Sequence, residues 1–286
     1  ILHGLLGNDL LGFHLQYHCN TFLDTVDRAL ESRVDYEHFA AWRGGRPTYV
    51  RPFPISIDPS LWKNRGDQTA ESRGVRQALG LNGEKMIFGV DRLDYTKGIP
   101  DRLRAFARLL DRYPEWRTRV VMVQVGAPSR EHLSTYQALM TEVQNCVDEI
   151  NAKYRADGWL PIVYRPQHHQ HDQVAQMYRA ADVCVVSSLH DGMNLVAKEF
   201  IAARNDERGV LVLSEFAGAA RELDQAVHIN PYAIDSFADA FNRALLMPAD
   251  DQRRRMRALR ERVASHTVFD WANALLLAAC RMEPVR

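Results

Sequence analysis

The chain has 286 residues, of which 46% are hydrophobic and 25% are charged, a composition typical of a folded globular protein with one large domain or one domain and part of another. Lysine plus arginine and aspartate plus glutamate both number 36, so the charge balance favours neither a nucleic-acid partner nor a membrane surface. The sequence shows no apolar run long enough for a transmembrane helix. The four cysteines lack metal-type spacing, which favours a reducing, cytoplasmic location over disulfides or zinc; they are Cys19, Cys146, Cys184 and Cys280.

The first part of the chain predicts a small mixed region. A short strand at Leu10–Leu11 precedes a helix from Gln16 to about Leu30. Gly44–Arg46 predicts a turn, and Tyr49–Ile57 predicts a strand interrupted by two prolines. We expect a domain boundary near residues 54–58, followed by a polar, partly helical segment.

From residue 86 onward the sequence alternates between apolar strands and amphipathic helices. This alternation predicts an α/β domain with a parallel sheet covered on both faces. Ligands of such sheets bind at the carboxyl ends of the strands. The predicted strands are Met86–Val90, Val120–Val125, Ile162–Tyr164, Val183–Val186, Val210–Leu213 and Val227–Ile229. The predicted helices are Pro100–Tyr113, 130–154, Gln173–Ala180, one opening at Met193 or Asn194, Ala217–Leu223, Ile234–Leu246 and Ala249–Ser265, with a further segment at Trp271–Met282.

The segment Cys184–Phe200 combines a buried strand, a polar turn and the start of a helix. The free N–H groups and positive dipole end of such a helix bind anions and polar ligand edges. Asp191 lies at this turn, where its carboxylate is suited to accept hydrogen bonds from sugar hydroxyls, and Glu199 follows inside the helix. The alternative is that Asp191–Gly192 is only a tight turn and Asn194 only an N-cap.

Polar segments also follow the neighbouring strands. In Gly89–Pro100, Arg92 and Lys97 lie on a loop before a helix, and two such cations suit a diphosphate. The alternative is that both cations pair with Asp91 and Asp94 at the surface. Two further polar strand ends, Gly126–Arg130 and Ser214–Ala220, are expected to converge on the same edge of the sheet.

Four separated motifs, VDRLDYTKGIP, APSR, DGMNLVAKEF and LSEFAGAA, closely resemble the trehalose-6-phosphate synthase family, the retaining glycosyltransferases of family 20 with the two-domain GT-B fold. The resemblance covers residues 1–280. It implies transfer of glucose from UDP-glucose to glucose 6-phosphate, giving α,α-trehalose 6-phosphate and UDP. It also implies that residues 57–286 form the carboxy-terminal nucleotide-sugar domain. Residues 1–56 would be the tail of the amino-terminal, acceptor-side domain and the linker, and the chain would lack most of that amino-terminal domain.

The resemblance assigns a role to each matching position. Arg92 and Lys97 grip the donor diphosphate, and Arg130 contacts the acceptor phosphate. Asp191 orients the donor glucose, which makes Arg92, Lys97 and Asp191 the expected catalytic residues. His169 corresponds to a main-chain contact with uracil. The donor loop and helix supply the remaining contacts, with Glu199 on the ribose; they are Gly192, Met193, Asn194, Leu195, Val196, Ala197, Lys198 and Glu199.

The same resemblance implies a metal-free and cofactor-free reaction. Arg92, Lys97 and main-chain N–H groups would stabilise the charge that develops on departing UDP, and the sequence has no Asp-x-Asp motif. The expected partners are the two small-molecule substrates, while a homo-oligomer is left open. One departure is His190, where the family usually has arginine; an imidazole there removes a fixed cation from the donor loop.

Other interpretations remain open at this stage. A glucosylglycerol-phosphate synthase using ADP-glucose and glycerol 3-phosphate would share these motifs. A non-catalytic nucleotide-sugar-binding or regulatory module is the alternative of a different class. Three histidines, His168, His169 and His171, lie close together, but their place in a loop favours variable polar residues over a metal site.

Overall fold

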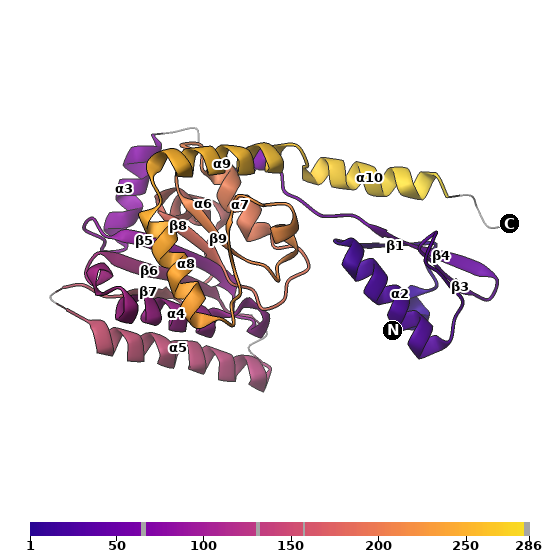
Figure 1. Ribbon diagram of the computed structural model, residues 1–286, viewed down its shortest axis with the longest axis horizontal. Coiled ribbons are helices and arrows are strands. Elements are labelled where there is room, and N and C mark those ends of the chain that lie inside the picture. The colour runs from indigo at the N-terminus through magenta and orange to yellow at the C-terminus, as the bar shows by residue number, and fades with distance from the viewer. Residues whose placement is uncertain (64–66, 130–131, 157, 283–286) are drawn as a thin grey trace. The chain divides into compact units, whose positions relative to one another are not determined.

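The computed structural model describes residues 1–63, 67–129, 132–156 and 158–282 (Figure 1). The chain forms two compact units. Unit 1 contains Ile1–Asp58 together with the residues from His266 onward, and unit 2 is Pro59–Ser265. The predicted assignment of residues 57–286 to one domain therefore differs from this division at its C-terminal end. The reason is local pairing, because Val268 N donates to Ile57 O at 3.0 Å.

Unit 1 contains a four-stranded sheet in the order β1-β4-β3-β2. β1 runs parallel to β4, while β3 and β4 form an antiparallel hairpin. Gly44 and Gly45 close the hairpin with φ angles of 56° and 80°, values that other residues adopt only with strain. The elements of unit 1 are α1 Leu2–Leu5, β1 Leu10–Phe13, α2 Gln16–Leu30, β2 Val34–Asp35, β3 Ala40–Arg43, β4 Arg46–Pro52 and α10 Val268–Cys280.

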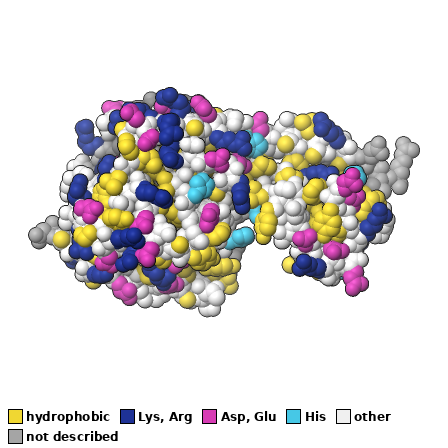
Figure 2. Space-filling model, in the orientation of Figure 1, with side chains coloured by type: hydrophobic (Ala, Val, Ile, Leu, Met, Phe, Trp, Pro, Cys, Tyr) yellow, Lys and Arg dark blue, Asp and Glu magenta, His cyan; other side chains and the backbone are white. Residues whose placement is uncertain are grey.

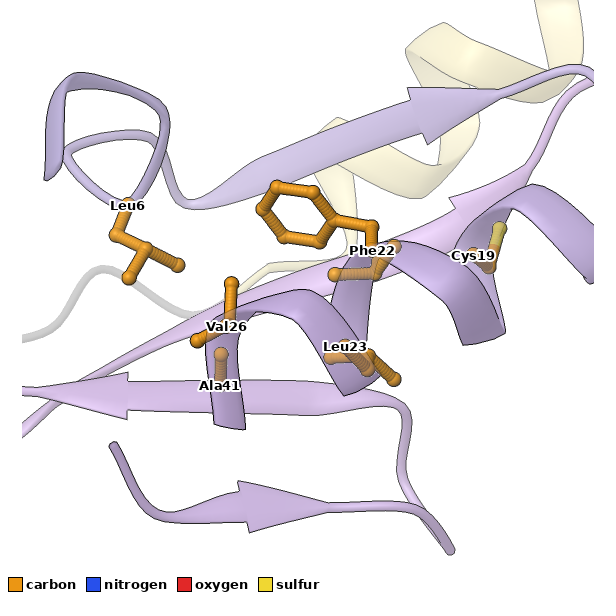
Figure 3. Packing of buried hydrophobic residues seen from close by; sticks show 7 residues of the cluster. Leu6, Cys19, Phe22, Leu23, Val26 and Ala41 are labelled. Atoms are coloured by element: carbon orange, nitrogen blue, oxygen red, sulfur yellow. The ribbon is translucent and has the colours of Figure 1, made fainter. Parts of the chain in front are cut away.

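Three features of unit 1 differ from the sequence prediction. The predicted strand Tyr49–Ile57 ends at Pro52, since Pro52 and Pro54 both lack the N–H group that a strand needs for pairing. The helix α1 and the strands β2 and β3 were not predicted. The helix α2 matches its prediction and buries residues at helical spacing against the sheet (Figure 3). The buried cluster is Leu6, Cys19, Phe22, Leu23, Val26, Ala41 and Val50.

Unit 2 contains a six-stranded sheet in the order β10-β9-β8-β5-β6-β7, and all of its strand pairs are parallel. The predicted α/β architecture is confirmed. The helices of this unit are α3 Gln68–Ala78, α4 Ile99–Arg112, α5 Ser134–Tyr154, α6 His171–Ala180, α7 Leu195–Ala203, α8 Ile234–Leu246 and α9 Ala249–Ala264. The strands are β5 Lys85–Arg92, β6 Val120–Ala127, β7 Ile162–Arg165, β8 Val183–Val186, β9 Val210–Ser214 and β10 Val227–Ile229. Short 3₁₀ helices are η1 Pro59–Trp62, η2 Tyr95–Lys97, η3 Pro114–Trp116 and η4 Gly218–Arg221.

The helices of unit 2 form two layers around the sheet (Figure 1). α4 packs against α5 and α8, while α6 packs against α3 and α7, and α7 against α9. β8 and β9 are buried along their whole length, as expected for a sheet covered on both faces. α4 buries Ile99, Leu103, Phe106 and Leu110 on one face, which is the apolar stripe that its sequence predicts.

Basic and acidic side chains are interspersed on the face drawn in Figure 2, in agreement with the balanced composition. Among the described residues, no helix has both the length and the apolar character that crossing a bilayer requires.

The burial of α4 leads to a stability prediction. Leu103 is fully buried, so Leu103→Ala leaves a cavity and should lower the free energy of unfolding of unit 2 by about 2–5 kcal/mol. Leu246→Ala is the matched control, because Leu246 is 63% exposed and its truncation should change that free energy by less than about 0.5 kcal/mol. Urea unfolding followed by circular dichroism measures both. Equal effects of the two substitutions would contradict the packing described here.

Candidate functional site

The candidate site lies where the chain order of the parallel sheet reverses. From β5 the chain proceeds to β6 and β7, and then returns to place β8 on the other side of β5. The loops that leave β5 and β8 therefore diverge and open a crevice at their carboxyl ends, which is the position at which doubly wound sheets bind ligands. Residues 93–98 and 187–194 form these two loops.

The two loops are joined by an ion pair. Lys97 Nζ lies 2.6 Å from Asp191 Oδ2, and the two side chains are 17% and 16% exposed. Ser188 Oγ at 3.3 Å and Asn194 Nδ2 at 3.1 Å contact the same carboxylate oxygen. The three side-chain donors thus share Oδ2, and the main-chain N–H of Met193 also interacts with this carboxylate. The structure thus brings together two of the three residues predicted to be catalytic.

The electrostatics of Asp191 favour its ionised form. Burial raises the pKa of this carboxyl, but the hydrogen bond and positive charge of Lys97, with a further hydrogen bond from Asn194, lower the pKa below its ordinary value. A carboxylate accepts hydrogen bonds without competing as a donor, which suits the orientation of a sugar through its hydroxyl groups.

Arg92 ends β5 with an exposed side chain. Within the part of the chain that the structure describes, its guanidinium has neither an ion pair nor a hydrogen bond. The alternative in which Arg92 and Lys97 pair with Asp91 and Asp94 is wrong: Lys97 pairs with Asp191, and Asp94 accepts from Thr96. Arg92 therefore keeps an uncompensated positive charge at the crevice.

Asp91 is bound instead by Arg102, a residue that the sequence analysis missed. Arg102 has no exposed surface. Its Nη1 donates to Asp91 Oδ2 at 2.7 Å and to Gln124 Oε1 at 2.8 Å, and its Nε donates to Ser187 Oγ at 2.9 Å. One arginine from α4 thereby connects the end of β5, the middle of β6 and the loop that follows β8.

A signal for this role is visible in the sequence. Arg102 lies three residues after Ile99 and four before Phe106, on the apolar face of α4. An arginine in such a stripe requires buried partners. Gly89 is part of the same arrangement, since a Cβ there would lie 2.4 Å from Arg102 Nη1.

The Asp191 loop leads directly into α7. Asn194 has a φ of 81° and caps the helix, its Oδ1 accepting from Ala197 N at 3.0 Å. The helix begins at Leu195, one or two residues later than predicted. The proposed N-cap role of Asn194 is confirmed, and its amide group also contacts Asp191. The first turn of α7 presents N–H groups that have no partner within the helix.

The small-residue turn after β9 supports this loop from the other side. Gly218 N donates to Asp191 O at 3.0 Å, and Ala219 N donates to Met193 O at 2.6 Å. A Cβ on Gly218 would lie 2.1 Å from the carbonyl oxygen of Gly192. The predicted helix Ala217–Leu223 is wrong in type, because the segment forms only the 3₁₀ helix η4; its small residues allow this close backbone approach.

The remaining predicted donor residues are placed as follows. Burial raises the pKa of Glu199, while Tyr178 opposes this shift by donating to Glu199 Oε2 at 3.1 Å. Lys198 is buried, with its Nζ 2.8 Å from Glu222 Oε2, so its side chain already has a carboxylate partner inside unit 2. Ala197 and Met193 are buried, whereas Gly192, Leu195 and Val196 are partly exposed.

His169 is not brought to the ion pair. His169 lies in the loop after β7, at the edge of the sheet, with its Nδ1 3.1 Å from Gln167 O. Arg130 lies outside the described residues. His190 is exposed. His171 packs against Trp62 with ring centroids 3.8 Å apart and the ring planes tilted by 49°. Within the described residues, no group of three or more histidine, cysteine, aspartate or glutamate side chains is arranged to hold a metal ion.

Comparison with known protein families shows the family to which this chain belongs. Residues 1–280 match the model of glycosyltransferase family 20. The chain belongs to glycosyltransferase family 20. A family member named trehalose-6-phosphate synthase, from Mycolicibacterium vanbaalenii, is 41% identical over 303 residues, which cover 100% of this chain and 60% of that protein. The curated relatives that this chain matches are longer, and it spans between 37% and 60% of their length.

Two solved structures resemble the chain closely. One is described as trehalose-6-phosphate from E. coli bound with UDP-2-fluoro glucose. Its TM-score is 0.92 at 33% sequence identity, and the match covers 99% of this chain and 63% of that chain. The other is a UDP-forming α,α-trehalose-phosphate synthase from Burkholderia xenovorans in complex with glucose-6-phosphate, with a TM-score of 0.90 at 34% identity, covering 97% of this chain and 62% of that one. These matches confirm the predicted GT-B type of fold.

The contact between Gly218 and Gly192 leads to a second prediction. Gly218→Ala should push the Asp191 loop away from η4, because its methyl group would overlap the Gly192 carbonyl. We expect a loss of about 1–3 kcal/mol in unfolding free energy and weaker binding of any ligand that uses this loop. Gly74→Ala is the control, since nothing lies within 4 Å of a Cβ there and alanine is the better helix former. Thermal unfolding distinguishes the two variants, and equal melting temperatures would count against the described loop packing.

The lowered pKa of Asp191 leads to a pH prediction. The ordinary pKa of this carboxyl is 3.8 and its folded value is lower, so the stabilisation is present above about pH 4 and is lost as pH falls through the folded pKa. Asp191→Asn should therefore lower unfolding free energy at pH 7 by about 1–3 kcal/mol, and the difference from the wild type should shrink below pH 4. Asp224→Asn removes an exposed carboxylate of unit 2 and serves as control. A difference for Asp191→Asn that does not change between pH 7 and pH 3 would contradict this assignment.

Proposed function

We propose that this chain carries the nucleotide-sugar site of a UDP-forming α,α-trehalose-phosphate synthase. The reaction is transfer of glucose from UDP-glucose to glucose 6-phosphate with retention, yielding α,α-trehalose 6-phosphate and UDP. The observation that carries the proposal is the Lys97–Asp191 ion pair beside the unpaired Arg92, at the point where the sheet order reverses. The structural relatives bound with UDP-2-fluoro glucose and with glucose-6-phosphate support the same substrates.

The charges of the site suit a diphosphate leaving group. Arg92 brings a positive charge that no described side chain compensates, and Lys97 lies on the loop that follows Arg92. As the bond to UDP breaks, negative charge grows on the β-phosphate, and cations fixed in advance stabilise it without reorganising. Main-chain N–H groups at the start of α7 add to this stabilisation. The reaction then needs no metal ion or cofactor in this proposal.

Asp191 acts as an orienting group rather than a nucleophile. Its Oδ2 accepts from Lys97, Ser188 and Asn194, and in this proposal Oδ1 accepts from a hydroxyl of the donor glucose. Glu199 would accept from the ribose, and the loop of His169 would contact the base. Arg130 would bind the acceptor phosphate. These roles follow from the family resemblance. For Asp191, the contacts described above also support the orienting role.

Two alternatives have less support. The relatives named above are trehalose-6-phosphate synthases, which favours UDP-glucose and glucose 6-phosphate over ADP-glucose and glycerol 3-phosphate. A binding module without activity would not require the intact arrangement around Asp191. The cytoplasmic location belongs to this proposal and is supported by the four cysteines, all of which are unpaired. A homo-oligomer remains compatible with it.

Calorimetric titration of the chain with UDP-glucose tests the donor site. We expect the double variant Arg92→Ala with Lys97→Ala to weaken binding by about 100-fold or more, since each charge-assisted hydrogen bond contributes about 1.5–3 kcal/mol. The matched control is Arg112→Ala with Lys153→Ala, which removes the same two side-chain types from α4 and α5 and should leave affinity unchanged. A chelator should also leave binding unchanged. Equal affinity in the wild type and the Arg92 and Lys97 variant would overturn the proposal.

A further inference from the structure

A cavity of about 1100 Å³ lies at the amino ends of β5, β8 and β9. It is bounded by α3, by the starts of these strands and by the loop that precedes β9. Because the strands are parallel, their amino ends lie at the edge of the sheet opposite the candidate site. Lys85 begins β5 and Arg92 ends it, so the two edges are about 23 Å apart at the usual rise per residue. All residues of the cavity belong to unit 2.

The charge of this cavity is strongly unbalanced. Two carboxylates line it, those of Asp182 and Asp206. A third, Glu71, pairs with Arg179 at 2.5 Å. Six cations face these three carboxylates, which leaves an excess of three positive charges in a chain whose net charge is zero. The cations are Arg73, Arg76, Lys85, Arg179, Arg204 and Arg208.

Two of the arginines are fixed in place by the wall of the cavity. Arg76 donates to Asp182 Oδ2 at 2.6 Å and to the main-chain oxygens of Ala180 and Glu84. The buried Arg204 donates Nη1 to three main-chain oxygens, including that of Ala181, and pairs with Asp206 at 3.0 Å. The carbonyl groups orient both guanidinium groups, and Asp182 and Asp206 compensate their charge, so this wall consists of fixed arginine–carboxylate pairs.

Two further arginines remain uncompensated. Arg73 comes from α3 and Arg208 from the loop before β9, and both line the cavity with exposed side chains. Across the described residues, neither guanidinium has an ion pair or a hydrogen bond. A concave surface with an excess of one sign of charge attracts counter-ions. Arg73 and Arg208 are thus available to a ligand without breaking an existing contact.

We propose that this cavity binds a small phosphorylated anion carrying at least two negative charges, at a site separate from the nucleotide-sugar site. Guanidinium groups match phosphate oxygens in a bidentate geometry. The volume is that of pockets that enclose small organic ligands. The proposal goes beyond the proposed function and does not depend on it, because no residue of the cavity takes part in the donor site.

Calorimetric titration of the full chain with inorganic pyrophosphate, at constant ionic strength and without divalent ions, tests this site. We expect two binding events in the wild type. Arg73→Gln with Arg208→Gln should abolish one of them or weaken it at least tenfold and leave the other unchanged. Arg92→Gln with Lys97→Gln should have the reverse effect. The matched control is Arg155→Gln with Arg243→Gln, which removes two exposed arginines of unit 2 outside the cavity and should alter neither event.

The outcomes separate the two sites. A single event that only the Arg92 and Lys97 variant removes would overturn the cavity proposal and leave the donor site standing. A single event that only the Arg73 and Arg208 variant removes would support the cavity and contradict the donor site. An equal loss in the control variant would show a general charge effect and would also overturn the cavity proposal. Circular dichroism confirms that each variant is folded.

Discussion

The parallel pairing of β8 with β5 is the constraint on which the candidate site depends. Their register aligns Ile87 with Val183 and Phe88 with Cys184, so the loops that follow the two strands leave the same edge of the sheet side by side. Lys97 and Asp191, which are far apart in sequence, form an ion pair only because of this register. The pair in turn compensates one of the two cations of the crevice and leaves Arg92 for a ligand.

Buried charge stabilises this edge of the sheet. Arg102 connects β5, β6 and the loop that follows β8 through Asp91, Gln124 and Ser187, and Ser187 Oγ is also 3.2 Å from the main-chain oxygen of Lys97. Leaving one member of a buried ion pair without its partner typically costs about 3–5 kcal/mol. Substitution of Arg102 or Asp91 alone is therefore expected to be strongly destabilising. The same hydrogen bonds hold the loop of Lys97 in one position relative to β8.

The two edges of the same sheet carry different kinds of positive charge. At the carboxyl edge, Arg92 ends β5 and Lys97 lies on the loop that follows, where it already has a carboxylate partner. At the amino edge, main-chain carbonyls and the carboxylates of Asp182 and Asp206 hold Arg76 and Arg204, while Arg73 and Arg208 remain uncompensated. The chain as a whole has a net charge of zero, yet the fold places uncompensated arginines at both edges of the sheet. The net charge, which is a sum over all residues, does not show such a local excess.

The sequence by itself determined the α/β class, the parallel sheet, most helix bounds and the polar strand ends, because periodicity and the Gly, Pro and Asn signals are local. It also placed Arg92, Lys97 and Asp191 at one edge, since parallel strands share their carboxyl ends. Only the tertiary structure decided which charges pair, that Arg102 is buried, that the segment at Gly218 is a 3₁₀ turn against Gly192, and that helix α10 belongs to unit 1. These features depend on contacts between residues distant in sequence, whose partners no local pattern specifies.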